Sequence, residues 1–215
     1  MLLINLLAIA LAGYLLGSIP TAIIVSKVFH GIDIREHGSG NAGATNVFRV
    51  LGWKSALLVM LVDVGKGVVA TLYASQLVFA PVTVEPVYLK LLAGLAAVFG
   101  HIWTVFAGFR GGKGVGTAAG MLLALYPIAV LICLAIFVIV VYSTRYVSLG
   151  SITAAVSLPI VLLIMKQGFH KFVEPELMAF SVFIAVLIVF THRSNIRRLI
   201  SGTENRFGQN TAKSS

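Results

Sequence analysis

The chain has 215 residues, of which 59% are hydrophobic and only 11% are charged, and its mean hydropathy is +1.00. A water-soluble domain carries about 25% charged residues, so these figures exclude an ordinary soluble protein and indicate a polytopic membrane protein. The net charge of +9 does not indicate nucleic-acid binding, because the basic residues are spread over several short loops between apolar segments. Anionic lipid headgroups and the positive-inside rule account for this excess.

The first half of the sequence alternates long apolar segments with short polar loops. The first segment, Leu2–Val28, meets its first basic residue, Lys27, at its far end, which favours an N-terminus outside the cell. The second, Ser55–Ala80, exceeds the ~20 residues that cross hydrocarbon. The turn at 80–86 carries no Lys or Arg, as an outer loop should, and Val87–Val105 returns to the inner side.

The apolar segment Thr117–Tyr142 decides the number of crossings. If it and the two later apolar runs each cross once, the C-terminal arginines lie outside, against the positive-inside rule. Two short helices hinged near Tyr126–Pro127 give seven crossings and keep those arginines inside. Five crossings, with Leu149–Phe190 as one broken span, give the same sidedness. We prefer seven, although a helix of about 10 residues is short for ~30 Å of hydrocarbon.

The predicted fold is therefore an all-α membrane protein with seven transmembrane helices, some of them short. The N-terminus lies outside and the C-terminus is cytoplasmic. Residues 1–200 form the membrane domain, and residues 201–215 form a polar cytoplasmic tail. The single cysteine, Cys133, lies in an apolar run, and the cysteine and histidine spacing of a zinc site is absent from the sequence, so no metal or cofactor is expected.

The stretch Gly38–Arg49, GSGNAGATNVFR, has the composition of a loop that wraps an anion. Glycine permits positive φ and close approach, successive N–H groups can converge, and arginine adds a bidentate fork. Both Gly-Lys pairs of the chain are followed by Gly, so neither belongs to a P-loop. Such a loop alone is more often a flexible connector. Its candidate ligands are Ser39, Gly40, Asn41, Thr45, Asn46 and Arg49.

A second glycine-rich stretch, Gly108–Thr117 (GFRGGKGVGT), follows about 70 residues later and is predicted on the same side of the membrane. It can be an ordinary positive-inside loop in contact with lipid. Paired with the first loop, it is better interpreted as a phosphate clamp, with Lys113 as a point charge beside Gly112 and Gly114. N–H groups at the start of the following helix would face the same anion.

Two ionisable sites lie in or near the predicted spans. Asp63 and Lys66 share one helix face at i and i+3, which fits a structural ion pair as well as it fits substrate binding by Lys66. His101 is either an interfacial histidine bound to a carbonyl or a substrate ligand and proton carrier.

Polar residues also flank the later spans. Ser148 and Ser151 precede an apolar run, and helix capping explains one of them. His192, Arg193 and Asn195 end the last apolar run and can be either a stop-transfer cap or part of a site.

Several motifs together resemble one family over nearly the whole chain. They are GSIPTA (Gly17–Ala22), SGNAGATNVFRVLG (Ser39–Gly52), DVGKG (Asp63–Gly67), GHIWTVFAGFRGGKGVGT (Gly100–Thr117), SLGS and HRSNIRR. They resemble the bacterial acyl-phosphate:glycerol-3-phosphate acyltransferase family. The resemblance implies a seven-helix enzyme of the bacterial cytoplasmic membrane whose site faces the cytoplasm. It would transfer a fatty acyl group from acyl phosphate to the sn-1 hydroxyl of glycerol 3-phosphate, the first step of phospholipid synthesis.

The H-x-x-x-x-D motif of other glycerol-phosphate acyltransferases does not occur. The residues five positions after the five histidines are Arg35, Ala42, Phe106, Pro175 and Arg197. The expected partners are glycerol 3-phosphate, acyl phosphate and membrane lipids, and no nucleic acid.

The resulting site hypothesis has two sets of residues. The catalytic set is Ser39, Arg49, Lys113, His192 and Asn195. The substrate-binding set is Gly40, Asn41, Thr45, Asn46, Lys66, His101, Gly112, Gly114, Ser148, Ser151 and Arg193. The general base stays open between the donor's own phosphate, His192 and His101.

Two rival functions are a transporter of organic phosphates and a non-catalytic scaffold. Transporters tend to place their sites at mid-membrane between paired broken helices, whereas these motifs cluster in inner loops.

Overall fold

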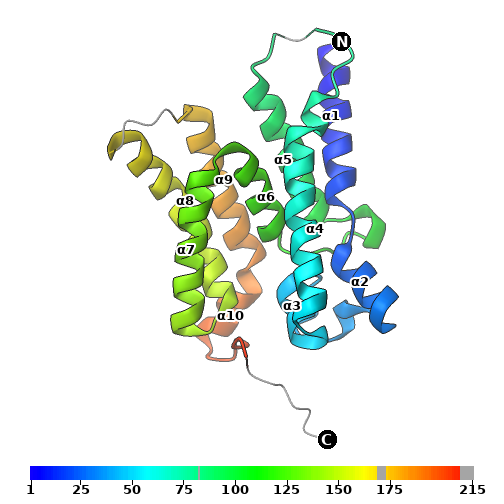
Figure 1. The fold of residues 1–215 in the computed structure, drawn as a ribbon, viewed down its shortest axis with the longest axis vertical. Helices are drawn as coiled ribbons and strands as arrows, with labels where there is room; N and C mark the ends of the chain where they lie inside the picture. Colours follow the sequence, from blue (N-terminus) through cyan, green and yellow to red (C-terminus); the bar gives the residue numbers. More distant parts are fainter. Residues whose placement is uncertain (82, 169–172, 209–215) are drawn as a thin grey trace, which may run out of the picture. The chain divides into compact units, whose positions relative to one another are not determined.

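The computed structural model describes residues 1–81, 83–168 and 173–208, and within these ranges the chain consists of helices and loops without a strand (Figure 1). This confirms the predicted all-α class. The chain forms two compact units, residues 1–125 and 126–215, which are described separately below. The division falls inside the stretch 1–200 that the sequence suggested as one membrane domain.

The first unit contains six α-helices and three short 3₁₀ helices among its described residues. These are α1 (Leu2–Gly17), α2 (Thr21–His30), η1 (Ile34–Glu36), α3 (Ala44–Leu51), α4 (Trp53–Leu72), η2 (Ala74–Gln76), α5 (Pro86–Ile102), η3 (Val105–Ala107) and α6 (Val115–Leu125). α1 packs along α5, and α4 packs along α6. In both helix pairs, the backbones of the two helices lie in close contact. A Cβ atom on Gly17 would lie 2.0 Å from the carbonyl oxygen of Ala97, and one on Gly120 would lie 1.9 Å from that of Val64.

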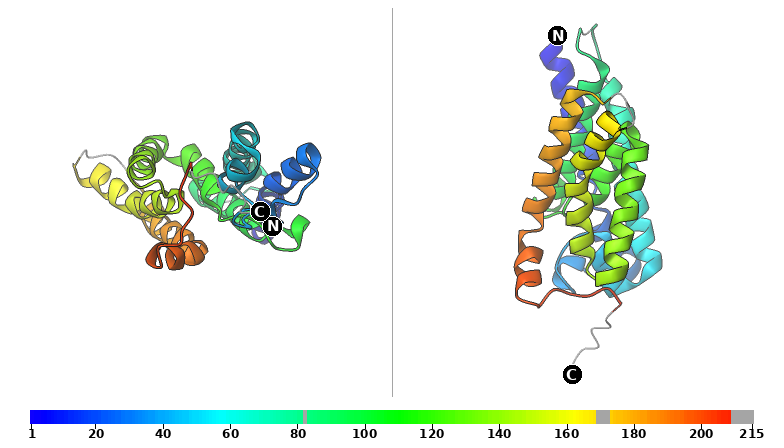
Figure 2. Two further views of the ribbon diagram at one scale, coloured as in Figure 1. Left: turned by 90° about the horizontal axis from the view of Figure 1, so that it is seen from below. Right: turned by 90° about the vertical axis from the view of Figure 1, so that its left-hand side faces the viewer.

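The second unit contains α7 (Pro127–Thr144), α8 (Val147–Gly168), α9 (Pro175–Thr191) and α10 (Arg193–Ile200). α8 packs against both α7 and α9, and α10 bends away from α9 by 61° (Figure 2). The break between α6 and α7 falls at Tyr126–Pro127, where the sequence predicted a hinge. α8 and α9 are separate helices that lie side by side, so the single broken span suggested for Leu149–Phe190 is not observed.

Five helical segments of the described ranges are long and apolar enough to cross a membrane, and a sixth is added if the bent pair of α9 and α10 counts as one span. The five are Leu2–His30, Trp53–Gln76, Pro86–Ala107, Pro127–Thr144 and Val147–Gly168. α6 is apolar but has only 11 residues. The chain is therefore a membrane protein with five to six candidate spans, and the predicted seventh crossing depends on α6.

Apolar side chains cover the outside of these helices. On α7, Leu131 is 58% exposed and Ile139 is 66% exposed. A continuous apolar face of this kind is a liability in water but a lipid contact in a bilayer. The packing thus agrees with the composition.

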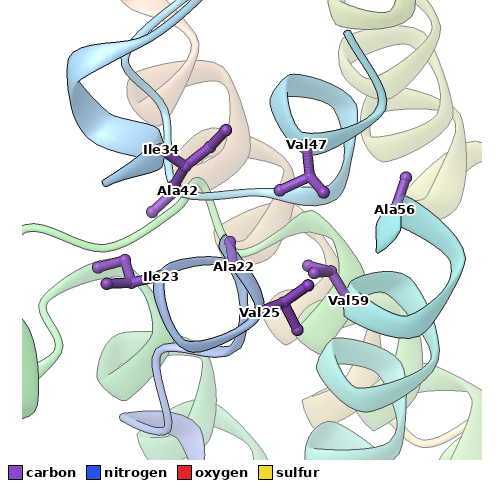
Figure 3. Packing of buried hydrophobic residues seen from close by; sticks show 8 residues of the cluster. All are labelled: Ala22, Ile23, Val25, Ile34, Ala42, Val47, Ala56 and Val59. Atoms are coloured by element: carbon purple, nitrogen blue, oxygen red, sulfur yellow. The ribbon is translucent and has the colours of Figure 1, made fainter. Parts of the chain in front are cut away.

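A small core supports the first glycine-rich stretch. It joins α2, η1, α3 and α4 through Ala22, Ile23, Val25, Ile34, Ala42, Val47, Ala56 and Val59 (Figure 3). Ala42 belongs to the glycine-rich stretch itself and is buried. The stretch is therefore anchored to a packed core and is not a flexible connector.

Candidate functional site

Asn46, in the first turn of α3, holds the opening loop (residues 38–43) in place. Its side chain is 1% exposed. Its Oδ1 accepts a hydrogen bond from the Ser39 N–H at 2.8 Å, and its Nδ2 donates to the carbonyls of Ile34 and His37 at 3.1 and 2.9 Å. The amide predicted to bind substrate is thus engaged with the backbone, and it shapes the loop that carries Ser39.

Backbone geometry accounts for the glycines of the opening loop. Gly38 and Gly40 have φ angles of +60° and +71°, which side chains rarely adopt. A Cβ atom on Gly38 would also lie 2.4 Å from Oδ1 of Asn46. Thr45 and Arg49, one helical turn apart on α3, are half-buried on a shared face.

The second glycine-rich loop (residues 108–114) is tied to the end of α5. The N–H groups of Gly111 and Gly112 donate to the carbonyls of Ile102 and His101 at 3.1 and 3.0 Å. They satisfy carbonyls that the last turn of a helix leaves unpaired. These two amides are therefore engaged within the protein, so the predicted anion contacts would fall to the segment from Lys113 into α6.

The two loops meet within the first unit. A Cβ atom on Gly112 would lie 2.8 Å from the carbonyl oxygen of Ala42, and Nη1 of Arg35 donates to the carbonyl of Ala107 at 3.0 Å. A cavity of about 430 Å³ lies at this meeting point. Residues of both loops and of η1 line it: Asp33, Arg35, Glu36, Gly40, Arg110 and Gly111.

Charge at the cavity is divided between a paired and an exposed arginine. Arg35 binds Asp33 through Nη2 at 2.7 Å and Nε at 3.0 Å, and Lys27 approaches the same carboxylate at 3.4 Å. The hydrogen bonds from Arg35 hold the pKa of Asp33 well below its usual range, and Asp33 raises the pKa of Arg35. Arg35 is thus neutralised by its partner. Arg110 is exposed and is the cation better placed to meet an anion from solution.

A buried ionic cluster lies beside the second loop. Nζ of Lys66 lies 2.9 Å from Oδ1 of Asp63 and also donates to the carbonyl of Ile19 at 3.0 Å. Nδ1 of His101 lies 3.5 Å from the same Oδ1. The side chains of Asp63, Lys66 and His101 are 6%, 4% and 8% exposed. The structural ion pair that the sequence left open for Lys66 is therefore present.

In the second unit, Glu204 gathers two of the predicted site residues. Its Oε1 accepts hydrogen bonds from Oγ of Ser148 at 2.8 Å and from Nδ2 of Asn195 at 2.6 Å. Its Oε2 accepts one from Nε of Arg198 at 2.7 Å. Sequence reasoning missed Glu204 because it fell in the stretch assigned to the tail. The signal was an isolated carboxylate six positions after Arg198.

The remaining candidates of this unit make local contacts. Nδ1 of the buried His192 lies 2.8 Å from the carbonyl of Ile188. Because a carbonyl only accepts, we infer that Nδ1 carries the proton and that Nε2 is the basic nitrogen. Arg193 is exposed, donates to the carbonyl of Phe190 at 3.2 Å and lies 4.6 Å from the centre of its ring. Ser151 donates to the carbonyl four residues earlier at 3.0 Å.

A family model described as glycerol-3-phosphate acyltransferase matches residues 7–202. The chain belongs to this family. Two relatives named glycerol-3-phosphate acyltransferase are similar along nearly their whole length. The protein from Chlorobium luteolum is 47% identical over 94% of this chain and 96% of its own, and that from Chlorobium limicola is 48% identical over 97% and 100%.

Two solved structures are also similar to this chain. Both are crystal structures of PlsY, an integral membrane glycerol 3-phosphate acyltransferase, at 38% sequence identity. The glycerol 3-phosphate form has a TM-score of 0.82 and covers 94% of this chain and 96% of its own. The lysophosphatidic acid form has a TM-score of 0.79 with 94% and 95% coverage.

As a member of the glycerol-3-phosphate acyltransferase family, the chain is a membrane-bound acyltransferase. Its candidate residues fall into two groups, one in each unit. In the first unit, the two glycine-rich loops touch and enclose a polar cavity. In the second, Glu204 brings Ser148 and Asn195 to one carboxylate. The chemistry available to these groups is anion binding, hydrogen-bond donation and, at His192, proton transfer.

Proposed function

We propose that this chain transfers a fatty acyl group from acyl phosphate to the sn-1 hydroxyl of glycerol 3-phosphate. The products are 1-acyl-sn-glycerol 3-phosphate and phosphate, and the reaction begins phospholipid biosynthesis. Family membership and the glycerol 3-phosphate and lysophosphatidic acid forms of the similar structures support the acceptor and the product. One geometric observation carries the proposal further. Gly40 of the opening loop and Arg110 and Gly111 of the second glycine-rich loop line one polar cavity, and Arg49 and Lys113 belong to the same two glycine-rich stretches without lining it.

The reaction needs little covalent catalysis by the protein, because acyl phosphate is an activated mixed anhydride. The sn-1 oxygen attacks the acyl carbon, the bond between that carbon and the phosphate oxygen breaks, and inorganic phosphate leaves. The hydroxyl proton passes to the leaving phosphate or to a protein base. Holding both phosphates in place and stabilising the oxyanion would supply most of the rate.

The catalytic roles are assigned by charge and hydrogen-bonding type. In the first unit, Arg49 and Lys113 neutralise phosphate, and Ser39 donates a hydrogen bond. In the second unit, Asn195 donates a hydrogen bond, and Nε2 of His192 is the candidate base besides the donor's own phosphate. Of the remaining predicted binding residues, Asn46, Gly112 and Lys66 are engaged within the protein and support the loops. The others orient the substrates through their side chains or loop backbones.

The proposed location is the bacterial cytoplasmic membrane, with seven crossings, the N-terminus outside and the loops that carry the site facing the cytoplasm. A contact inside the second unit supports this count. Tyr126, at the start of α7, donates a hydrogen bond to Glu174, which directly precedes α9. The start of α7 thus lies at the same end of this unit as the start of α9, which is the predicted outer side. In the proposed topology, α6 crosses the membrane and brings the chain to that side.

The experiment that tests the function compares acyl donors. Purified protein would receive labelled glycerol 3-phosphate with palmitoyl phosphate or with palmitoyl-CoA. We expect lysophosphatidate from palmitoyl phosphate only, and equal rates from both donors would contradict the proposal. Vesicles that take up glycerol 3-phosphate without any acyl donor would favour the rival transporter.

A further inference from the structure

The carboxylate of Asp63 contacts the imidazole of His101, and this imidazole in turn contacts the second glycine-rich loop. We propose that Asp63 and His101 are positioning residues, which hold this loop in the conformation that binds the phosphate of glycerol 3-phosphate, and that Lys66 balances the charge of Asp63. The identity of the ligand in this inference rests on the proposed function. The coupling between Asp63, His101 and the loop does not depend on it.

The first step concerns two charged side chains in α4. A helix that faces lipid would have apolar residues at these positions. Asp63 and Lys66 lie in the middle of α4 and are almost fully buried, with 2.9 Å between Oδ1 and Nζ. A buried carboxylate is unfavourable unless it is paired. Lys66 is engaged on its other side by the carbonyl of Ile19. Its ammonium is therefore held inside the first unit, where it neutralises Asp63.

The second step is the orientation of His101. Its Nδ1 faces Oδ1 of Asp63 at 3.5 Å, and a carboxylate on that side favours the tautomer with the proton on Nδ1. Its other edge faces the glycine loop, because a Cβ atom on Gly112 would lie only 2.2 Å from Nε2. The imidazole is thus fixed between a charge on α4 and the backbone of Gly112.

The third step is the number of contacts that converge on Gly112. The carbonyl of His101 accepts its N–H at 3.0 Å, and the imidazole of the same residue lies against its Cα. The carbonyl of Ala42 in the opening loop also lies close to Gly112, 2.8 Å from the same Cβ position. A shift of His101 would therefore move Gly112, the next residue Lys113, and the contact between the two loops.

α6 completes this arrangement over Asp63. A Cβ atom on Gly116 would lie 3.3 Å from Cβ of Asp63, so the first turn of α6 packs directly on this side chain. The loop that carries Lys113 is thus held at both ends: at Gly111 and Gly112 by the end of α5, and at Gly116 by α4. Both supports depend on the placement of Asp63 and His101.

The test uses a variant that removes both charges of the ion pair between Asp63 and Lys66. Asp63→Asn alone leaves a buried lysine unbalanced and threatens folding, so the principal variant is Asp63→Asn with Lys66→Gln. Gly65→Ala is the matched control, because it lies on the same helix and a Cβ atom there meets nothing within 4 Å. All variants are compared in detergent by gel filtration and thermal unfolding.

The first readout needs no substrate. Amide hydrogen exchange in peptides covering residues 103–116 reports on the hydrogen bonds of Gly111 and Gly112. We expect exchange there to be at least ~10-fold faster in the paired variant and unchanged in Gly65→Ala. Unchanged exchange in the paired variant would overturn the proposal, whether or not the chain proves to be an acyltransferase that uses acyl phosphate.

The second readout is kinetic. The proposal predicts that the paired variant raises KM for glycerol 3-phosphate about tenfold or more and changes kcat by less than ~3-fold. A double-mutant cycle compares His101→Asn, the paired variant and the combination of the two, and the combined loss is expected to be no larger than about that of the worse of the two. Additive losses, or a fall in kcat with KM unchanged, would contradict positioning. If the wild-type protein forms no lysophosphatidate, the proposed function fails and the exchange measurement alone decides this inference.

Discussion

At the scale of single residues, two buried polar side chains organise the candidate site. Asn46 makes three hydrogen bonds to the backbone of the opening loop, and Glu204 accepts three from side chains of the second unit. The sequence pointed to Asn46 as a substrate ligand, because a motif shows which residues are present but not which backbone groups fold back onto them. Glu204 escaped prediction for the same reason, since its partners lie up to 56 positions away.

Replacing Asn46 tests the role of the first of these side chains. Asn46→Asp places an oxygen where Nδ2 now donates to the carbonyls of Ile34 and His37. A buried hydrogen bond left unmade costs about 1–3 kcal/mol. We therefore expect kcat/KM to fall at least about tenfold and Tm in detergent to fall by about 2–4 °C per kcal/mol.

His37→Ala is the control for this experiment, because it retains the backbone carbonyl that Asn46 binds. It is expected to leave kcat/KM and Tm close to those of the wild type. An Asn46→Asp protein with wild-type kinetics and Tm would show that the amide does not maintain the loop.

The pH dependence of stability tests Glu204. Burial raises the pKa of Glu204, but hydrogen bonds from Asn195, Arg198 and Ser148 outweigh it, so that the net pKa lies below the ordinary value of 4.5. A carboxyl group with a lowered pKa stabilises the fold above its unfolded pKa, and this contribution is lost as pH falls through the folded pKa. We expect the Tm advantage of the wild type over Glu204→Gln to be full at pH ~7 and to shrink below pH ~4.5. An advantage that is constant with pH would rule out this carboxylate as the cause.

At the scale of elements, apolar length predicted most helices but not their interruptions. Leu2–Val28 was treated as one mildly interrupted segment, whereas α1 ends at Gly17 and α2 begins at Thr21. Pro20 lacks an N–H and disfavours helical geometry in the residue before it, which accounts for the break. The helix α3 was also not predicted, because its eight residues follow a run of glycines and polar residues. Its formation puts Arg49 on a helix instead of a loop.

Glycine substitutions in α4 test the close packing of α4 on α6. A Cβ atom on Gly67 would lie 2.2 Å from the carbonyl oxygen of Thr117, whereas one on Gly65 meets nothing within 4 Å. Gly67→Ala should force the helices apart and lower the free energy of unfolding by about 1–3 kcal/mol. Gly65→Ala should be neutral or raise it by up to about 1 kcal/mol. Unfolding in a denaturing detergent titration compares the two, and equal effects would contradict the packing described.

At the scale of the whole molecule, hydropathy predicted the membrane class. The charge distribution predicted which loops face the cytoplasm, and this orientation stays a prediction. The number of crossings was harder to predict, because α6 spans only about 16 Å at 1.5 Å per residue, against ~30 Å of hydrocarbon. Length rules alone cannot decide whether so short a helix crosses. The pairing of the two glycine-rich loops was predictable in outline, since both were assigned to the same side. The residues that join them were not.

Cysteine labelling tests the proposed topology. In a Cys133→Ser background, single cysteines would replace Glu85, Tyr126, His37 and Gly202. Seven crossings predict that an impermeant maleimide labels intact cells at positions 85 and 126, and labels positions 37 and 202 only after permeabilisation. Labelling of position 202 from outside would refute the assigned orientation, and protection of position 126 would refute the crossing of α6.

The claim on which this account depends is that the two glycine-rich stretches hold the phosphate groups of the substrates, the first through Arg49 on α3 and the second through Lys113. The most direct measurement is lysophosphatidate formation from palmitoyl phosphate and glycerol 3-phosphate by Arg49→Ala and Lys113→Ala, with the exposed Lys54→Ala as the control. The account predicts that each loop variant loses at least ~100-fold in kcat/KM, while the control retains wild-type turnover. Undiminished turnover in both loop variants would contradict it.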